Sequence, residues 1–311
     1  MATAMKKKTF WHRLKKDFKE NWIRYVMILP VIVYFIVFHY APMYGILMAF
    51  QDYRIKLGVW GSEWVGLKHF RLFFSNYSFK SLIINTLTLS VYSLVVGFPV
   101  PIVFALMLNY LRSSKLKKVV QMVSYAPHFI STVVICGMIS IFTTPQTGVF
   151  NVILELLGGE SVNFMASQPL FKHIYVWSGV WQGMGWSAII YISALAGVDY
   201  QMHEAAIIDG ANKIQRMIYI DIPSIKSTII MLLILRFGGL MSVGFEKVYL
   251  LQNSLNKPAA STISTYTYEL GLLRADYSYS TAVGLFNTVI NVILMVSANF
   301  ISKKVADESL F

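Results

Sequence analysis

Long apolar runs constrain this chain more than any other feature of its sequence. Six stretches each have about the length that crosses the hydrocarbon core of a bilayer as a helix. They cover residues 25–50, 82–108, 119–143, 174–198, 227–251 and 282–301. Because backbone polar groups in lipid must be satisfied within their own segment, we expect each stretch to be an α-helix. The sequence therefore predicts an all-α integral membrane protein whose six transmembrane helices form one domain over residues 25–301.

The composition agrees with a membrane protein. Of the 311 residues, 56% are hydrophobic and 14% are charged, against roughly 25% charged residues in soluble domains. The single cysteine excludes an intrachain disulfide and a cysteine metal cluster. The net charge of +12 would suggest nucleic acid in a soluble chain. Basic cytoplasmic loops explain that charge without a nucleic-acid partner.

Charge also predicts the orientation in the membrane. Six spans place both termini on one side, and most of the 27 Lys and Arg residues lie in the segments on that side. The positive-inside rule then predicts cytoplasmic N- and C-termini, with a basic segment at residues 1–24 and a tail at residues 302–311. Trp11, Leu14, Phe18 and Trp22 share one helical face, which favours an interfacial helix over a solvated basic tail.

The cytoplasmic loop at residues 199–226 has a regular pattern. A short helix is predicted over residues 200–209, and Gly210 then permits the positive φ that ends a helix. A second short helix follows over residues 212–219, and Pro223 ends it. Physical chemistry alone leaves two interpretations open, a rigid element that docks on a cytoplasmic protein or a hairpin packed under its own membrane domain.

The spacing in this loop resembles a known motif. Glu204-Ala205-Ala206, then Gly210, then Ile220 and Pro223 are similar to the EAA loop of permease subunits in binding-protein-dependent ABC importers, with Ile222 in place of the usual leucine. The resemblance assigns contact with the ATPase to Glu204, Ala205, Ala206, Asp209, Gly210, Ile220 and Pro223.

The resemblance extends over most of the chain. The segments at residues 64–70, 126–130 and 243–247 resemble MalF-side carbohydrate permeases and, more narrowly, LplB/YteP-type permeases associated with polysaccharide fragments. This family implies the MetI-like fold of ABC type I importers, in the bacterial cytoplasmic membrane. It implies a heterodimer with a second permease, two cytoplasmic ATPase subunits and an extracytoplasmic solute-binding protein. The implied function is to form half of the path for an oligosaccharide and to couple that path to the ATPase.

The chain is not expected to be an enzyme. The sequence contains no Gly-x-x-x-x-Gly-Lys-Ser/Thr phosphate loop. No cofactor is therefore expected in this chain, and ATP and Mg²⁺ are expected in the partner ATPase subunits. The alternative function is a secondary transporter driven by an ion gradient, which would predict internal repeats and interrupted helices. An intramembrane enzyme would need paired catalytic groups, and formal acids are nearly absent from the spans.

A sugar path needs aromatic faces and hydrogen-bonding groups. The candidate residues on the fourth, fifth and sixth spans are Trp177, Trp181, Gln182, Trp186, Arg236, Asn287 and Asn291. Polar groups in membrane helices also bridge helices, and tryptophans also sit at the membrane interface. Arg236 in mid-span could meet an acidic sugar or form a buried ion pair. His39 and His128 lie on different spans, so no metal site is predicted.

Overall fold

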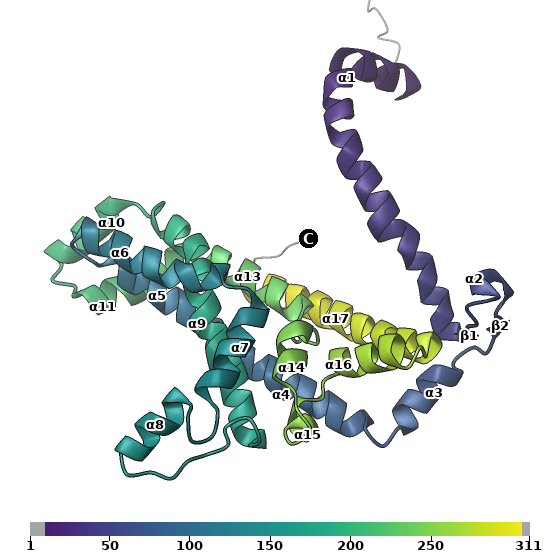
Figure 1. Cartoon of the computed structure of the whole chain (residues 1–311). Helices are drawn as coiled ribbons and strands as arrows, with labels where there is room; N and C mark the ends of the chain where they lie inside the picture. The colour runs from purple at the N-terminus through teal and green to yellow at the C-terminus, as the bar shows by residue number, and fades with distance from the viewer. Residues whose placement is uncertain (1–9, 307–311) are drawn as a thin grey trace, which may run out of the picture.

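The structure is a computed structural model that describes the backbone of residues 10–306 and the exposure of side chains over residues 17–304. The described chain is almost entirely helical, as predicted (Figure 1). One two-stranded antiparallel sheet occurs within residues 10–306, where β1 (Gln51–Asp52) pairs with β2 (Glu63–Trp64). Lys6, Lys7 and Lys8 of the predicted basic segment lie outside the described residues.

The first predicted span is a long helix whose first part stands away from the other helices. α1 (Phe10–Phe35) continues through η1 (Ile36–Tyr40) and η2 (Ala41–Phe50), and non-helical dihedral angles at Asn21 bend it near its start. The apolar window of this helix has no part buried within the chain, and Figure 1 shows α1 leaving the other helices. Its apolar side chains therefore need lipid or another protein around them.

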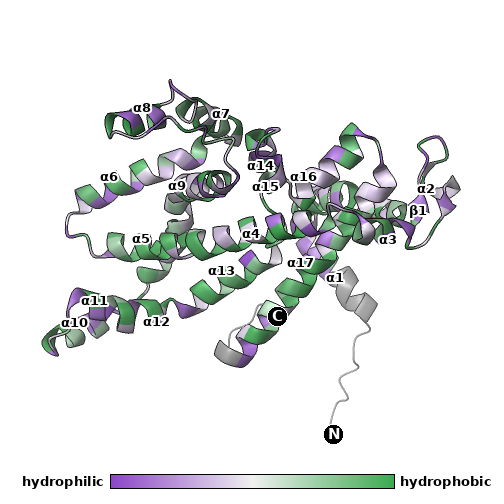
Figure 2. Cartoon of the chain, turned by 90° about the horizontal axis from the view of Figure 1, so that it is seen from below, coloured by the Kyte–Doolittle hydropathy of each residue, from purple (hydrophilic) through white to green (hydrophobic). Residues whose placement is uncertain are grey.

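Four further helices form the packed body of the molecule. α4 (Phe79–Gly97) continues into α5 (Pro99–Asn109) as one long apolar span. α9 (Gln168–Leu195) packs against both, and α17 (Tyr277–Ala306) packs along α13 (Lys226–Gly238) and η2. The hydropathy colouring shows α5, α13 and α17 as mainly apolar (Figure 2), which matches their predicted place in lipid.

Two predicted continuous spans are bent or broken in the structure. The stretch at residues 119–143 consists of α6 (Ser114–Tyr125) with η3 (Ala126–Phe129) and, after a bend of 96°, α7 (Thr132–Phe142). Pro127 lies at the bend, and the Ser131 hydroxyl accepts a hydrogen bond from the Val134 N–H and so begins α7. Three continuous helices of the described chain are long and apolar enough to cross a membrane, and the number rises to five if this bent pair and a second one, Lys213–Ser224 with Lys226–Gly238 bent by 65°, each count as one span. α9 adds a further long helix of 28 residues.

The fifth predicted span, residues 227–251, is broken as well. α13 ends at Gly238, and helix resumes only in α14 (Phe245–Leu251). α13 has 13 residues, which is ~20 Å at 1.5 Å per residue and less than the ~30 Å of the hydrocarbon core. The apolar run continues through the break, but the glycines at 238, 239 and 244 favour a non-helical backbone there.

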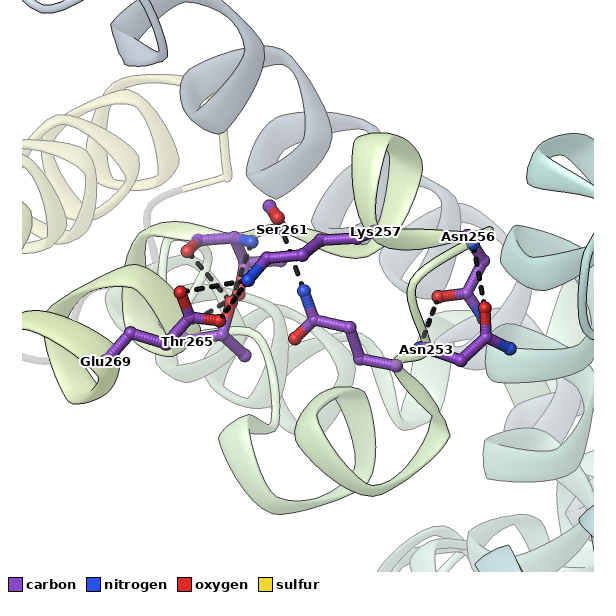
Figure 3. A network of polar contacts seen from close by, with 8 residues as sticks. Asn253, Asn256, Lys257, Ser261, Thr265 and Glu269 are labelled. Carbon is purple, nitrogen blue, oxygen red and sulfur yellow. Dashed lines mark hydrogen bonds and ion pairs between the residues drawn. The ribbon is translucent and has the colours of Figure 1, made fainter. Parts of the chain in front are cut away.

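A polar network fixes the segment after the break (Figure 3). Asn253 and Asn256 exchange hydrogen bonds between backbone N–H groups and side-chain oxygens at 2.8 and 2.9 Å. Lys257 Nζ lies 2.7 Å from Glu269 Oε1. α15 (Lys257–Ala260) packs against α9 and α4, whereas α16 (Ile263–Tyr268) and η5 (Glu269–Leu273) pack against α17. The remaining short helices are α2 (Gly58–Gly61), α3 (Lys68–Ser75) and α8 (Val149–Leu156).

Candidate functional site

The loop at residues 199–226 folds as two helical pieces joined at Gly210, as predicted, but the second piece does not end at Pro223 as predicted: helix continues through it to Ser224, because proline is tolerated in the first turn of a helical segment. α10 (Tyr200–Ile208) begins at Asp199, whose carboxylate accepts the Gln201 N–H at 2.9 Å. Gly210 has φ +81° and turns the chain. A capping box between Asn212 and Gln215 then begins α11 (Lys213–Arg216), which continues through η4 (Met217–Asp221) and α12 (Ile222–Ser224). The positive φ predicted at Gly210 is therefore confirmed.

The tip of this loop is exposed and its base is buried. Glu204, Ala205, Asp209 and Gly210 are exposed, while Ala206 is half-buried. Ile208, between them, is 85% exposed, and Ile207 and Ile214 on the same loop are 50% and 67% exposed, so the loop presents several apolar side chains. At the base, Ile220 is buried and Pro223 is exposed. The loop lies at the end of the molecule opposite the β1–β2 sheet (Figures 1 and 2).

A buried acid anchors the base of the loop. Asp221 is fully buried, and its Oδ2 accepts a hydrogen bond from the hydroxyl of Tyr110, which follows α5, at 2.7 Å. The other oxygen, Oδ1, lies 3.2 Å from His203 Nε2 on α10. The Arg216 guanidinium stands 5.5 Å above the ring of Tyr110. Burial and then the bond to Asp221 raise the pKa of Tyr110, so this hydroxyl remains a donor at neutral pH.

Sequence reasoning missed this anchor. The signal was visible as one acid in the apolar run of residues 217–223. Its donor at Tyr110 is 111 residues away in the sequence, so no local pattern could have paired them. The anchor joins the base of the loop to the C-terminal end of the span formed by α4 and α5.

The predicted sugar-path residues fall into three places. Gln182 and Arg236 line one cavity of about 290 Å³ between α4, α9 and the break after α13. Trp177 and Trp181 line a separate, larger apolar cavity of about 560 Å³ beside α7. Trp186 lies in neither cavity lining and stacks on the His128 ring, with the centroids 4.5 Å apart. The structure therefore does not bring the fourth-span aromatics into one surface with Arg236.

The two asparagines of the sixth predicted span also have different surroundings. Asn291 is buried; its Oδ1 accepts the Met241 N–H at 2.8 Å and its Nδ2 donates to Ser242 Oγ at 2.9 Å. This residue thus satisfies the backbone where α13 has ended. Asn287, one turn earlier, has a buried Oδ1 without a hydrogen-bond partner.

The smaller cavity contains a residue that sequence reasoning did not select. Lys247, on α14, lines it together with Arg236. Both residues were visible as charges inside the fifth apolar run, but Lys247 had no evident partner in the sequence. Within the described residues, no group of three His, Cys, Asp or Glu side chains could hold a metal ion.

A loop with this geometry on a bundle of membrane-length helices is what the EAA resemblance implies. The family model of the inner membrane component of binding-protein-dependent transport systems matches residues 97–307. The chain belongs to this family. It is therefore a membrane permease component of a binding-protein-dependent ABC transporter and not an enzyme, and ATP hydrolysis in such systems is carried out by a partner ATPase.

Curated relatives extend over the whole chain. The Protein LplB of Bacillus subtilis (strain 168) is 43% identical over 311 residues, covering 100% of this chain and 96% of that protein. The polygalacturonan/rhamnogalacturonan transport system permease protein YteP of the same strain is 43% identical over 310 residues, with the same coverage. The predicted likeness to LplB/YteP-type permeases is therefore confirmed.

Solved structures confirm the fold. A bacterial alginate ABC transporter, in complex with a periplasmic protein that holds an alginate pentasaccharide, contains a chain 39% identical to this one. The match covers 96% of this chain and 100% of that chain, with a TM-score of 0.89. The interrupted helices, which would also have suited an ion-gradient transporter, thus belong to an ABC permease fold.

Proposed function

We propose that this chain is the MalF-side permease of an ATP-driven importer of oligosaccharides released from polysaccharides. It forms half of the translocation path together with a second permease, expected to be a different chain. Two cytoplasmic ATPase subunits bind ATP and Mg²⁺, and an extracytoplasmic solute-binding protein delivers the sugar. Relatives described as transporting polygalacturonan, arabinooligosaccharide or alginate support the substrate class.

The observation that carries the coupling role is the exposed tip of the loop above a buried anchor. Glu204 and Ile208 are free to contact another protein, and the Asp221–Tyr110 bond ties that contact to the end of α5. Closure of the ATPase pair would move the loop as one piece and so tilt α13 and the α4–α5 span. The path would then change from cytoplasm-facing to outward-facing.

Co-purification is the direct test of the assembly. The tagged chain is expected to retain a second permease and an ATPase when the neighbouring genes are expressed with it. An ion-gradient transporter would be stable without them. A chain that purifies alone, and still takes up sugar in vesicles that hold no ATP, would contradict the proposal.

A substitution at Gly210 tests the coupling. Valine at φ +81° is strained by roughly 1–2 kcal/mol, and no atom would obstruct its Cβ within 4 Å, so the expected effect is a changed angle between α10 and α11. Gly210→Val should leave the complex assembled and reduce sugar-stimulated ATP hydrolysis and uptake. Gly158→Val is the matched control, because Gly158 has φ +84° and equally open space in a remote loop. Equal sugar uptake by Gly210→Val and Gly158→Val would show that the bend at Gly210 has no role in coupling.

A further inference from the structure

The small cavity is positively charged and has no acid in its wall. Its lining comes from α4, α9 and residues 236–247, and includes Arg236 and Lys247. Among the described lining residues there is no Asp or Glu. A site with two formal positive charges and no counter-charge, at the level of a broken membrane helix, is costly unless water or an anion enters it.

Lys247 is the more confined of the two cations. Its side chain is 8% exposed, and its Nζ donates to the Tyr175 carbonyl oxygen at 3.0 Å and stands 5.2 Å above the Tyr175 ring. An ammonium has three N–H donors, so two are left for a ligand. Lys247 takes part in none of the ion pairs of the described residues, which join His203 with Asp221 and Lys257 with Glu269.

A second, independent group in the same wall also lacks a partner. Ser90 Oγ, on α4, is buried with no hydrogen bond, and Ser90 is 8% exposed. Unsatisfied buried polar atoms are rare and call for an explanation. At Gly179 the absence of a side chain keeps the ammonium accessible, because a Cβ there would lie 3.3 Å from Lys247 Nζ. The wall thus presents free donors around open space.

We propose that this cavity recognises the carboxylate of an acidic sugar unit, with Lys247 as the residue that selects for negative charge. The inference rests on the proposed oligosaccharide function and names the substrate class as uronic-acid oligosaccharides. Lys247 binds the carboxylate, Ser90 supplies a neutral hydrogen bond, and Arg236, which is exposed on the same wall, attracts the anion. At about 290 Å³ the cavity is at the small end of ligand sites, so it receives one sugar unit of a chain at a time.

Charge-matched variants test the role of Lys247. The assembled transporter, with its binding protein, is reconstituted in vesicles, and uptake of trigalacturonate is compared with uptake of its methyl ester. Lys247→Met should reduce uptake of trigalacturonate at least tenfold and spare the ester, whereas Lys247→Arg should retain most uptake of the acid. Lys226→Met is the control, because Lys226 is exposed at the start of α13 and outside the cavity, and it should behave as the wild type.

Ser90→Ala gives a second test that does not depend on the charge. Removal of an unpaired buried hydroxyl should leave stability unchanged or raised, since nothing in the folded chain bonds to it. Uptake of trigalacturonate should nevertheless fall about threefold, as expected for one lost neutral hydrogen bond of ~0.5–1.5 kcal/mol.

Three results would overturn the inference. An equal loss of trigalacturonate uptake in Lys247→Met and Lys247→Arg would show that Lys247 contributes packing and not charge. Loss of the second permease from Lys247→Met complexes would show that the counter-charge belongs to that subunit. Unchanged uptake of trigalacturonate by Lys247→Met would remove the charge-selecting role and leave the oligosaccharide function intact. If the wild-type complex imports an arabinooligosaccharide but neither trisaccharide, the uronic-acid inference fails and the proposed function stands; if it imports no oligosaccharide, the proposed function fails as well.

Discussion

At the residue scale, Asp221 shows how a single buried acid can organise a surface loop. A buried carboxylate is stable only with partners around it: Asp221 Oδ2 accepts a hydrogen bond from Tyr110 after α5, and Oδ1 lies 3.2 Å from His203 Nε2 on α10 without a hydrogen bond to it. The carboxylate therefore fixes the position of α10 relative to the transmembrane body. This anchoring does not require Asp221 to touch a partner.

Removal of the Tyr110 hydroxyl tests this anchor. Tyr110→Phe leaves Asp221 Oδ2 without its 2.7 Å donor, at a cost of about 1–3 kcal/mol. We expect a lower melting temperature of the purified complex and weaker coupling of ATP hydrolysis to sugar. Tyr77→Phe is the control, because Tyr77 is 100% exposed. If both variants have the melting temperature and the sugar-stimulated ATP hydrolysis of the wild type, the loop is held by other contacts.

At the element scale, the break between α13 and α14 is the feature that hydropathy does not reveal. The apolar run continues through Met241 and Val243, so the sequence predicted one helix. The free Met241 N–H at the break finds a partner on α17 instead, where Asn291 Oδ1 accepts it and Asn291 Nδ2 donates to the Ser242 hydroxyl. Non-helical backbone at membrane depth is tolerated where it lines a cavity in this way.

The two asparagines of α17 form a natural matched pair for this interpretation. Asn291→Leu leaves the Met241 N–H unpaired in a buried site, so we expect a loss of stability of ~1–3 kcal/mol. Asn287→Leu removes an amide whose Oδ1 bonds to nothing in the folded chain, so stability should not fall. Thermal unfolding of the two purified variants measures the difference. Equal destabilisation would contradict the structural role of Asn291, and reduced sugar uptake by Asn287→Leu alone would favour a place for Asn287 in the sugar path.

The sequence predicted most of the long helices and the two-helix form of the loop at residues 199–226, because both depend on local patterns. Apolar length located the spans, and the spacing from Glu204 to Pro223 located the loop. The anchor at Asp221 and the cavity around Lys247 depend on contacts between distant segments, such as Lys247 with Tyr175, 72 residues apart. The tryptophans of the fourth span were grouped by helical periodicity alone, which does not tell which neighbour each ring meets.

At the scale of the whole molecule, the isolated chain is incomplete as a folded unit. The apolar window of α1 is unburied, and that of α17 is only 11% buried. Exposed Trp177, Trp181 and Ile208 add apolar surface on other elements. Lipid alone can cover α1, whereas the exposed Ile207, Ile208 and Ile214 of the predicted cytoplasmic loop lie where the proposed ATPase contact would cover them.

The orientation of the chain can be tested with two introduced cysteines. Tyr77 and Lys115 flank the span formed by α4 and α5, whose 31 residues extend ~46 Å and exceed the ~30 Å core. They must therefore lie on opposite sides of the membrane. The native Cys136 is the only cysteine and is buried, so it should give little background labelling.

With a membrane-impermeant maleimide on intact cells, we expect Tyr77→Cys to be labelled and Lys115→Cys to be labelled only after permeabilisation. The result also places the coupling loop, because the Tyr110–Asp221 bond ties the loop to the same end of the span as Lys115. The reverse pattern would put the loop outside the cell, where no ATPase could reach it. Labelling of Ile208→Cys then tests the contact itself, since bound ATPase should protect position 208 and leave position 115 reactive.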